Sequence, residues 1–388
     1  MTPSGREAGW LLNCKTGWKY KPKDTVKAGL LASEVKRNSL DFVIGTAALN
    51  DWTLVNLPFA DEFPRNRQIN LGAAKLAFVA SEGEHPHWDS ILGHCFQELD
   101  TVLPHYTWAK ENGIHTGADY GRAWIACLFR QPQQPLPYLF LHSKKENAGK
   151  SILAESLKLL LLRGTVDGAL ALKSDFNGEL ENQILAYIDD FDLSVKSAGQ
   201  QIVGKLKRWV TSQTIPIRRM RTDVYEMCNT LHWVQTANSR SECPVFPGDT
   251  RITFLQVEPL KSEIPKEALL GKLKAEAAAF LWTIDHLTLP TVSGRLRIPV
   301  IDTSSKRRTQ DSVRTPVQEF IDEACKKTGE TVAKEFYECL VSWCHKREIS
   351  PIPKSRSVYN ELADHGFGTR NGTGNRLIFQ GLSIEVTE

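Results

Sequence analysis

Short apolar runs separated by longer amphipathic stretches dominate the middle of this chain. Four such runs cover residues 137–141, 184–188, 231–236 and 252–257. A strand that is buried on both faces reads as a nearly unbroken apolar run, so these segments are predicted to be central strands of a parallel sheet. The stretches between and after them favour helices, above all residues 266–287 with their many Ala, Leu, Lys and Glu residues. The alternation predicts an α/β domain.

Helical patterns are also expected upstream of the strands. They cover residues 71–81, 88–103 and 118–130, and the last of these is predicted to pack under the sheet. Residues 18–50 are mixed in pattern. The first 120 residues are therefore predicted to be a mainly helical region, which is either a collar that fixes assembly or the remnant of a larger chain.

Beyond residue 315 the pattern predicts three helices and a hairpin. The helices cover residues 316–327, 332–347 and 357–365, and the hairpin surrounds the Gly- and Asn-rich turn at 369–376. This order is typical of a winged helix. Its basic side chains either bind duplex DNA or decorate a structural cap; they are Lys354, Arg356, Arg370 and Arg376.

The first apolar run leads into a loop that ends in Gly149-Lys150-Ser151 and then into a helical pattern. This is the order of a phosphate-binding loop, in which backbone N–H groups at a helix start surround a triphosphate. Lys150 would add a cation for the β- and γ-phosphates, and the Ser151 hydroxyl would ligate Mg²⁺. Lys144 stands where the general motif has its first glycine, so a surface turn before an ordinary helix is the alternative. The predicted nucleotide-binding residues are Asn147, Ala148, Gly149, Lys150, Ser151 and Ile152.

Polar side chains accompany the three later runs. Asp189 and Asp190 directly follow residues 184–188, and open α/β sheets bind ligands at the carboxyl ends of their strands. Asp189 is suited to hold Mg²⁺ through water, and Asp190 to orient or deprotonate an attacking water. Asn238 follows the third run and can hydrogen-bond that water or the γ-phosphate. Arg251 precedes the fourth, and a guanidinium can stabilise the charge on a transferring phosphoryl group.

In this order, residues 147–151, 187–190, 236–238 and 249–251 resemble the motifs of superfamily 3 helicases. More narrowly, they resemble the helicase module of phage and plasmid primase–helicases and primase–polymerases, as do residues 176–180 just before the acidic strand. The similarity runs roughly from Gly121 to the chain end. It implies an AAA+ ATPase that uses ATP and Mg²⁺ and assembles as a ring, usually a hexamer, around DNA.

The resemblance also implies roles for single residues. Asn238 would be the sensor, and Arg251 an arginine finger that acts across a subunit interface. The implied catalytic set is Lys150, Asp189, Asp190, Asn238 and Arg251, and the implied metal ligands are Ser151 and Asp189.

A basic segment lies between the acidic strand and the sensor strand. A charge run of this kind is more often a solvated surface, but in the resembled family a hairpin at this position holds single-stranded DNA in the channel of the ring. Binding of this kind weakens as salt rises. The predicted DNA contacts are Lys205, Lys207, Arg218, Arg219 and Arg221.

Composition changes this picture little. The net charge of the 388 residues is only +3, so DNA binding must come from a local basic patch. No apolar run is long enough to span a membrane, and the first residues lack the apolar core of a signal peptide, so a soluble, cytoplasmic protein is expected. The 8 cysteines form no C-x-x-C pair and are expected to be reduced thiols. The group His85, His87, His94 and Cys95 is interpreted as a loop and helix rather than a metal site.

These patterns divide the chain into a mainly helical region (1–120), an AAA+-like ATPase domain (121–295), a linker (296–314) and a winged-helix-like domain (315–388). The hypothesis is an ATP-dependent DNA helicase of a phage, plasmid or mobile element. It would translocate on single-stranded or forked DNA as a homo-oligomeric ring, beside a primase or polymerase partner. One alternative is an AAA+ ATPase that loads or remodels replication proteins without unwinding DNA. The other is a non-hydrolysing origin-binding module.

Overall fold

In the computed structural model, the chain forms two compact units. The larger unit takes its residues from Met1–Val245 and Asp249–Arg307, and the smaller from Phe246–Gly248 and Arg308–Glu388. The residues that the structure describes are 10–14, 17–49, 52–143, 145, 148–189, 191–193, 195–219, 224–245, 248–260, 264–312, 315–347, 349–374 and 376–385.

A five-stranded parallel sheet forms the centre of the larger unit, in the order β13-β6-β12-β9-β8. Its strands are β6 (Tyr138–His142), β8 (Thr165–Asp167), β9 (Leu185–Asp189), β12 (His232–Ala237) and β13 (Ile252–Gln256). The predicted α/β class with a parallel sheet is confirmed. Because the strands are parallel, they all end at one edge, here called the carboxyl edge, and all begin at the opposite, amino edge.

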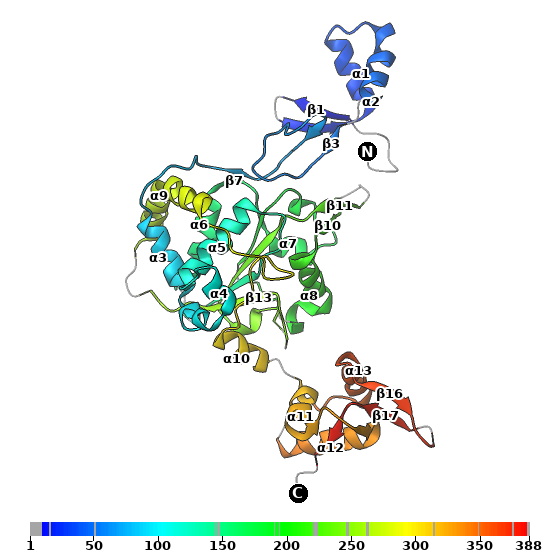
Figure 1. The fold of residues 1–388 in the computed structure, drawn as a ribbon. Coiled ribbons are helices and arrows are strands. Elements are labelled where there is room, and N and C mark those ends of the chain that lie inside the picture. Colours follow the sequence, from blue (N-terminus) through cyan, green and yellow to red (C-terminus); the bar gives the residue numbers. More distant parts are fainter. Residues whose placement is uncertain are drawn as a thin grey trace. The chain divides into compact units, whose positions relative to one another are not determined.

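Helices cover both faces of this sheet, as Figure 1 shows. Alternate strand residues point to opposite faces. Leu139 and Leu141 therefore join the core with α3, α5, α6 and α9, whereas Tyr138 and Phe140 join a second core with α7 and α8. The bounds are α3 (Pro86–Cys95), α5 (Gly117–Arg130), α6 (Lys150–Leu159), α7 (Gly168–Lys173), α8 (Val195–Thr211) and α9 (Lys266–His286).

The N-terminal part contains strands as well as the expected helices. Its elements are β1 (Trp10–Cys14), β2 (Gly17–Lys21), α1 (Lys23–Ala32), α2 (Leu40–Leu49), β3 (Thr53–Leu54), β4 (Gln68–Ile69), β5 (Lys75–Leu76) and α4 (Thr107–Glu111). The helix predicted at 71–81 is wrong. Gly72 has a φ of +69°, outside the helical range, and β5 pairs with β7 (Leu161–Arg163). This tertiary pairing overrides the local helix propensity.

The helix predicted at 88–103 is shorter than expected. It stops at Cys95, and 3₁₀ turns follow at Gln97–Thr101 and Leu103–His105. The first residue of α5, Gly117, lies against the Phe96 carbonyl so closely that a Cβ would be 1.9 Å from the oxygen. Phe96 directly follows the last residue of α3, so this close contact lies at the point where the helix ends.

A hairpin extends from the larger unit between α8 and β12. Its strands are β10 (Thr214–Ile217) and β11 (Tyr225–Cys228), and Ile217 pairs with Tyr225 nearest the turn. Ile215 and Ile217 are buried in the core beneath α8, so the base of the hairpin is fixed to the body of the unit. The hairpin lies at the amino edge, because it immediately precedes the start of β12.

The smaller unit has a separate core of three helices and short strands, built around Phe320, Phe336, Leu340 and Phe379. The elements are α11 (Pro316–Ala324), β14 (Cys325–Lys326), β15 (Glu330–Val332), α12 (Ala333–Lys346), α13 (Ser355–Asp364), β16 (Gly368–Asn371), β17 (Leu377–Gln380) and β18 (Ser383–Ile384). β16 and β17 pair as a hairpin, and β15 adds a third strand.

Residues Ser304–Ser312, where the sequence indicates a polar linker, form helix α10. The Thr303 hydroxyl accepts a hydrogen bond from the Lys306 N–H at its start (3.2 Å). The side chain of Lys306 is buried and donates to the Asp249 carbonyl at 2.8 Å. Such contacts between distant segments are not visible in a local polar pattern. Within the described part of the chain, no helix has the length and apolarity to cross a membrane.

Candidate nucleotide and DNA-binding sites

Lys150 and Asn238 meet at the carboxyl edge. Lys150 is the first residue of α6, directly after Gly149, whose φ of +80° favours glycine. The Lys150 ammonium donates a hydrogen bond of 2.7 Å to Asn238 Oδ1, just beyond the end of β12. Lys150 is only 8% exposed. A nearly buried lysine at a helix start, held by a neutral amide, leaves its positive charge available for an anion.

Asp189 lies at the same edge, at the end of β9. The four preceding residues of β9 are buried, whereas Asp189 is exposed. Thr236 is paired with Asp189 in the sheet, and its hydroxyl donates to the Asp189 carboxylate. Tyr187 stands beside them, with its hydroxyl 3.3 Å from Thr236 Oγ1, and burial raises its pKa. The carboxylate is thus oriented by its neighbours while one side remains open to solvent.

A half-buried cation completes this part of the edge. The Lys158 ammonium lies 4.0 Å from the centre of the Tyr187 ring. Burial lowers the pKa of Lys158, although the nearby carboxylates Glu155 and Asp189 raise it. The sequence interpretation counted Tyr187 and Thr236 among the residues of the family motifs but gave them no role, and it did not include Lys158 in the site. Only their spacing along α6 and at the ends of the strands could have indicated them.

Of the predicted nucleotide residues, the structure brings Ala148, Gly149 and Lys150 to the carboxyl edge. Ser151 is half-buried in the first turn of α6. The side chain of Ile152 packs in the core, so only its backbone could serve a ligand. Asn147, Asp190 and Lys144 lie outside the described residues.

His94 is a further residue of this region that the sequence interpretation did not place there. Its Nε2 lies 2.7 Å from the Ala148 carbonyl oxygen, so this nitrogen carries the proton and donates. The Cys95 thiol contacts the Gly149 carbonyl at 3.9 Å. The end of α3 therefore supports the Ala148-Gly149 backbone. In this loop Lys144 stands at the position where the general motif has its first glycine.

The other members of the histidine group have separate partners. His87 bonds to Glu276, and His85 contacts Thr283 and Asp89. Among the residues described, no three His, Cys, Asp or Glu side chains gather as a metal site would require. Mg²⁺ commonly binds through one or two carboxylates, phosphate oxygens and water, and this mode fits Asp189 and Ser151 beside the Lys150 cation.

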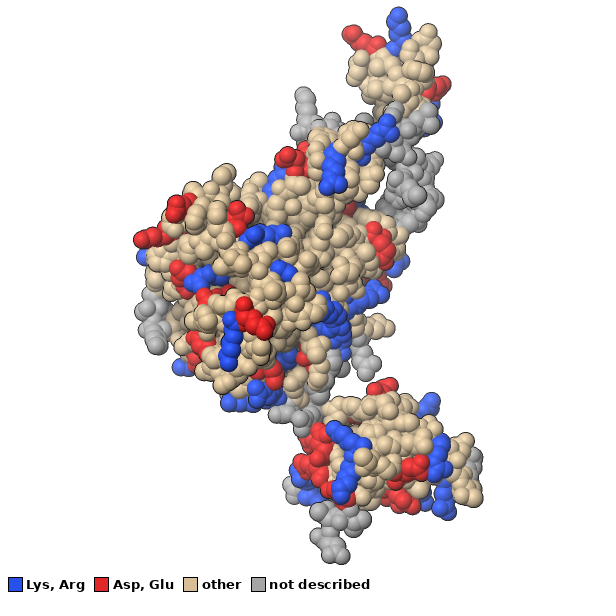
Figure 2. Space-filling view, viewed as in Figure 1, with Lys and Arg blue, Asp and Glu red and all other residues tan. Residues whose placement is uncertain are grey.

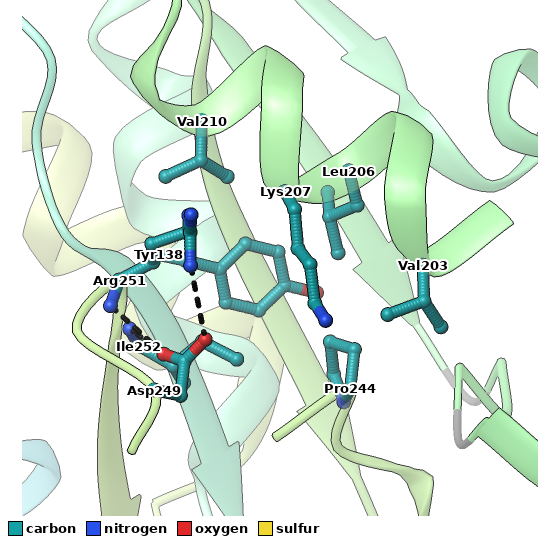
Figure 3. Close-up of a pocket in the computed structure, with 9 residues that line it drawn as sticks. All are labelled: Tyr138, Val203, Leu206, Lys207, Val210, Pro244, Asp249, Arg251 and Ile252. Carbon is teal, nitrogen blue, oxygen red and sulfur yellow. Dashed lines mark hydrogen bonds and ion pairs between the residues drawn. The ribbon is translucent and has the colours of Figure 1, made fainter. Parts of the chain in front are cut away.

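Arg251 lies at the opposite, amino edge, because it precedes β13, whose first residue pairs with Tyr138 at the start of β6. Figure 3 shows its guanidinium turned toward Asp249, in a small pocket that Tyr138 and Lys207 also line. Asp249 Oδ1 accepts from the backbone N–H of Arg251 (2.8 Å) and Ile252 (3.0 Å), and Oδ2 lies 3.7 Å from the guanidinium. Within one chain, the structure does not bring Arg251 to Lys150 and Asp189.

The basic residues predicted to contact DNA fall into two groups. On α8, Lys205 donates to the Ser174 carbonyl at 3.0 Å, and Lys207 points into the pocket beside Asp249. Burial lowers the pKa of Lys207. Arg218 and Arg219 follow β10 at the base of the hairpin loop, whereas Arg221 lies outside the described residues. Charges of both signs are interspersed over the face of the protein in Figure 2.

Residues 176–181, here called the clamp loop, hold the base of the hairpin. Asn177 is buried, and its amide donates to the Pro216 carbonyl (2.8 Å) and accepts from the Arg218 N–H (2.7 Å). Its backbone N–H donates to the Arg218 carbonyl at 3.0 Å. The Arg218 guanidinium lies 5.3 Å from the centre of the Phe176 ring. The clamp loop therefore positions the residues predicted to bind DNA.

The chain is similar to known proteins in sequence and in fold. Residues 141–251 match a protein family of unknown function, DUF5906. The chain is 20% identical over 137 residues to the DNA primase-polymerase of Nitratiruptor phage NrS-1, and this match covers 34% of the chain and 19% of that protein. The chain therefore spans about a fifth of the length of this curated relative.

Two solved structures share the fold. An apo structure of the NrS-1 C-terminal region has a TM-score of 0.63 at 12% sequence identity, over 97% of this chain and 94% of that one. The A form of that region has a TM-score of 0.60 at the same identity and coverage. This protein thus has the fold of the C-terminal region of NrS-1 and is related in sequence to a phage primase-polymerase.

Proposed function

We propose that the protein is an ATP- and Mg²⁺-dependent DNA helicase that acts in phage or plasmid replication and moves along single-stranded DNA. The observation that carries the proposal is the meeting of Lys150, Asn238 and Asp189 at the carboxyl edge of the sheet. Lys150 and Asn238 come after β6 and β12, and Asp189 is the last residue of β9. A cation, an amide and an open carboxylate therefore lie at one edge of the sheet. That set matches the requirements of a magnesium-bound triphosphate.

Each side chain has a role that follows from its position. Bound Mg²⁺-ATP would supply the phosphoanhydride bond whose hydrolysis drives movement. Lys150 would exchange its hydrogen bond with Asn238 for phosphate oxygens, and Asn238 would then be available to orient the attacking water. Asp189, held by Thr236, would face the metal side of the phosphates. Asp190 is proposed as the residue that activates the water.

The position of Arg251 supports action on a neighbouring copy. It lies at the amino edge, and the five residues of β6 place that edge about 13 Å from the carboxyl edge. An arginine at this edge can reach a nucleotide only on another subunit. We therefore propose a ring, with a hexamer as the expected size, in which Arg251 of one copy stabilises the phosphoryl group bound to the next.

The similarity to a primase-polymerase suggests where such an activity would be used. A polymerase needs single-stranded template, and a helicase supplies it. We propose that this module works on forked DNA beside a primase or polymerase, which is either a separate protein or a neighbouring part of a longer chain.

The test begins with Lys150→Ala, compared with Lys274→Ala, which removes an exposed lysine of α9. Wild type and Lys274→Ala are expected to show DNA-stimulated ATP hydrolysis and to separate the strands of a forked substrate, and Lys150→Ala to lose both. Unimpaired hydrolysis by Lys150→Ala would overturn the site. Hydrolysis without strand separation in wild type would favour a protein that loads or remodels other replication factors. Tight Mg²⁺-ATP binding without turnover would favour a non-hydrolysing origin-binding module.

A mixing experiment addresses Arg251. Arg251→Ala keeps an intact carboxyl edge, and Lys150→Ala keeps an intact arginine. If Arg251 acts across the interface, mixed assemblies contain some sites with both residues, and hydrolysis rises above that of either variant alone. Mixtures no more active than the separate variants would argue against action in trans. The exception is a ring in which every site must function. Dilution of wild type with a doubly substituted chain identifies such a ring, because hydrolysis then falls more steeply than the fraction of wild type.

A further inference from the structure

The hairpin base carries an ion pair that involves one of its predicted DNA contacts. The Arg219 guanidinium bonds to the carboxylate of Glu181, the last residue of the clamp loop. Arg219 is 40% exposed and Glu181 is 15% exposed, so the pair lies at the boundary between the surface and the interior. Glu181 is also four residues before β9, the strand that ends in Asp189.

The backbone around this pair is closely fitted. A Cβ at Gly178 would lie 2.7 Å from Arg219 Cγ, so the arginine stem rests directly on the glycine. Asn177 fixes the neighbouring residue, Arg218, through its backbone. Arg219 is therefore directed toward Glu181 by its stem and by its neighbour, whereas Arg218 is exposed beside Phe176.

We propose that Glu181 is a latch that competes with DNA phosphate for Arg219. A guanidinium forms the same two-pronged hydrogen bonds with a carboxylate and with a phosphate, so one partner excludes the other. With the latch closed, the hairpin presents Arg218 but not Arg219, and full engagement of the strand requires the ion pair to open. The proposal rests on the DNA-binding role of the hairpin and adds to it a control of affinity.

Glu181→Gln tests the latch, because the amide keeps the shape and removes the charge. Binding to a fluorescein-labelled single-stranded oligothymidylate is measured by anisotropy at several salt concentrations, in the full chain without nucleotide. The affinity is expected to rise about threefold or more at low salt, and the log–log salt slope to steepen by about 0.7, as for one added phosphate contact. A merely structural ion pair gives no such gain when it is broken.

Three further variants make the result specific. Glu226→Gln removes a negative charge from β11 of the same hairpin and is expected to leave affinity nearly unchanged, because the effect depends on Arg219. Glu181→Gln combined with Arg219→Ala is expected to lose the gain. Glu181→Asp retracts the carboxylate by one methylene and is expected to give an intermediate affinity, which provides the answer if Glu181→Gln does not fold.

The outcomes separate the latch from the proposed function. If wild type binds the oligonucleotide and Arg218→Ala weakens binding, but Glu181→Gln binds no more tightly, only the latch is overturned. An equal gain in Glu226→Gln also overturns it, because loss of negative charge would then be sufficient. If neither wild type nor Glu181→Gln binds, both the latch and the DNA-binding role are overturned.

Discussion

Asn177 offers a quantitative test of how the hairpin is held. Its buried side chain satisfies two partly buried backbone groups, the Pro216 carbonyl and the Arg218 N–H. Asn177→Ala leaves both without a partner, in a site where the native side chain is 5% exposed. An unsatisfied buried group costs about 1–3 kcal/mol, so the expected loss in the free energy of unfolding is about 3 kcal/mol.

Asn112→Ala is the matched control. The Asn112 amide donates to the Trp108 carbonyl (2.7 Å) and to the Thr291 hydroxyl (3.1 Å), and it accepts from the Thr291 N–H (2.7 Å). This site is open to water, which replaces the lost partners, so the expected loss is about 1 kcal/mol. Asn112 makes one hydrogen bond more than Asn177, so a smaller loss in Asn112→Ala would reflect its exposure to water and not the number of hydrogen bonds.

Urea unfolding of the larger unit gives the free energies, and hydrogen exchange read by mass spectrometry locates the change. In Asn177→Ala, peptides covering β10 and β11 are expected to lose protection, whereas Mg²⁺-ATP still protects α6 because the carboxyl edge is distant. A loss no greater than that of Asn112→Ala, or unchanged protection in the hairpin, would refute the clamp.

Two further predictions concern histidines. His94→Ala removes the hydrogen bond to the Ala148 carbonyl and is expected to weaken Mg²⁺-ATP binding about fivefold to tenfold by calorimetry, whereas the exposed control His105→Ala should bind normally. Burial lowers the pKa of His232 from 6.5 to about 4, so the folded state favours the neutral ring. The contribution of the neutral His232 ring to the free energy of unfolding is fully present above pH 6.5 and is lost as the pH falls toward 4. Between pH 7 and 4.5, the free energy of unfolding is expected to fall by about 2–3 kcal/mol more in wild type than in His232→Gln. Parallel pH profiles of the two proteins would contradict this assignment.

The sequence was a good guide to the central sheet, for a physical reason. Strands buried on both faces must be apolar throughout, so the runs at 137–141 and 184–188 lie within a residue of β6 and β9. The strands' parallel order also makes their carboxyl ends meet, which is why Lys150, Asp189 and Asn238 could be grouped before their positions were known. The winged-helix interpretation of the smaller unit and the assigned roles of the site residues stay predictions.

Local pattern was less informative where distant segments decide the structure. Residues 71–81 contain helix formers, yet β5 pairs with β7 some 85 residues later. The polar residues of α10 indicate a linker, yet Lys306 is buried against the Asp249 carbonyl. The support of the phosphate loop by His94 and the pairing of Arg219 with Glu181 likewise join segments that no periodicity relates. In each case the decisive partner is remote in sequence.

The separation of the two edges of the sheet has a consequence for assembly. If the proposed roles hold, a chain whose Lys150 and Asp189 lie at one edge and whose Arg251 lies at the other carries half of each of two sites. If these halves combine, the contact is head-to-tail, and repetition of that contact either closes on itself or continues as a filament. An isolated pair joined by one such contact would contain a single complete site, so turnover per chain should rise with every subunit added until closure gives each chain two neighbours.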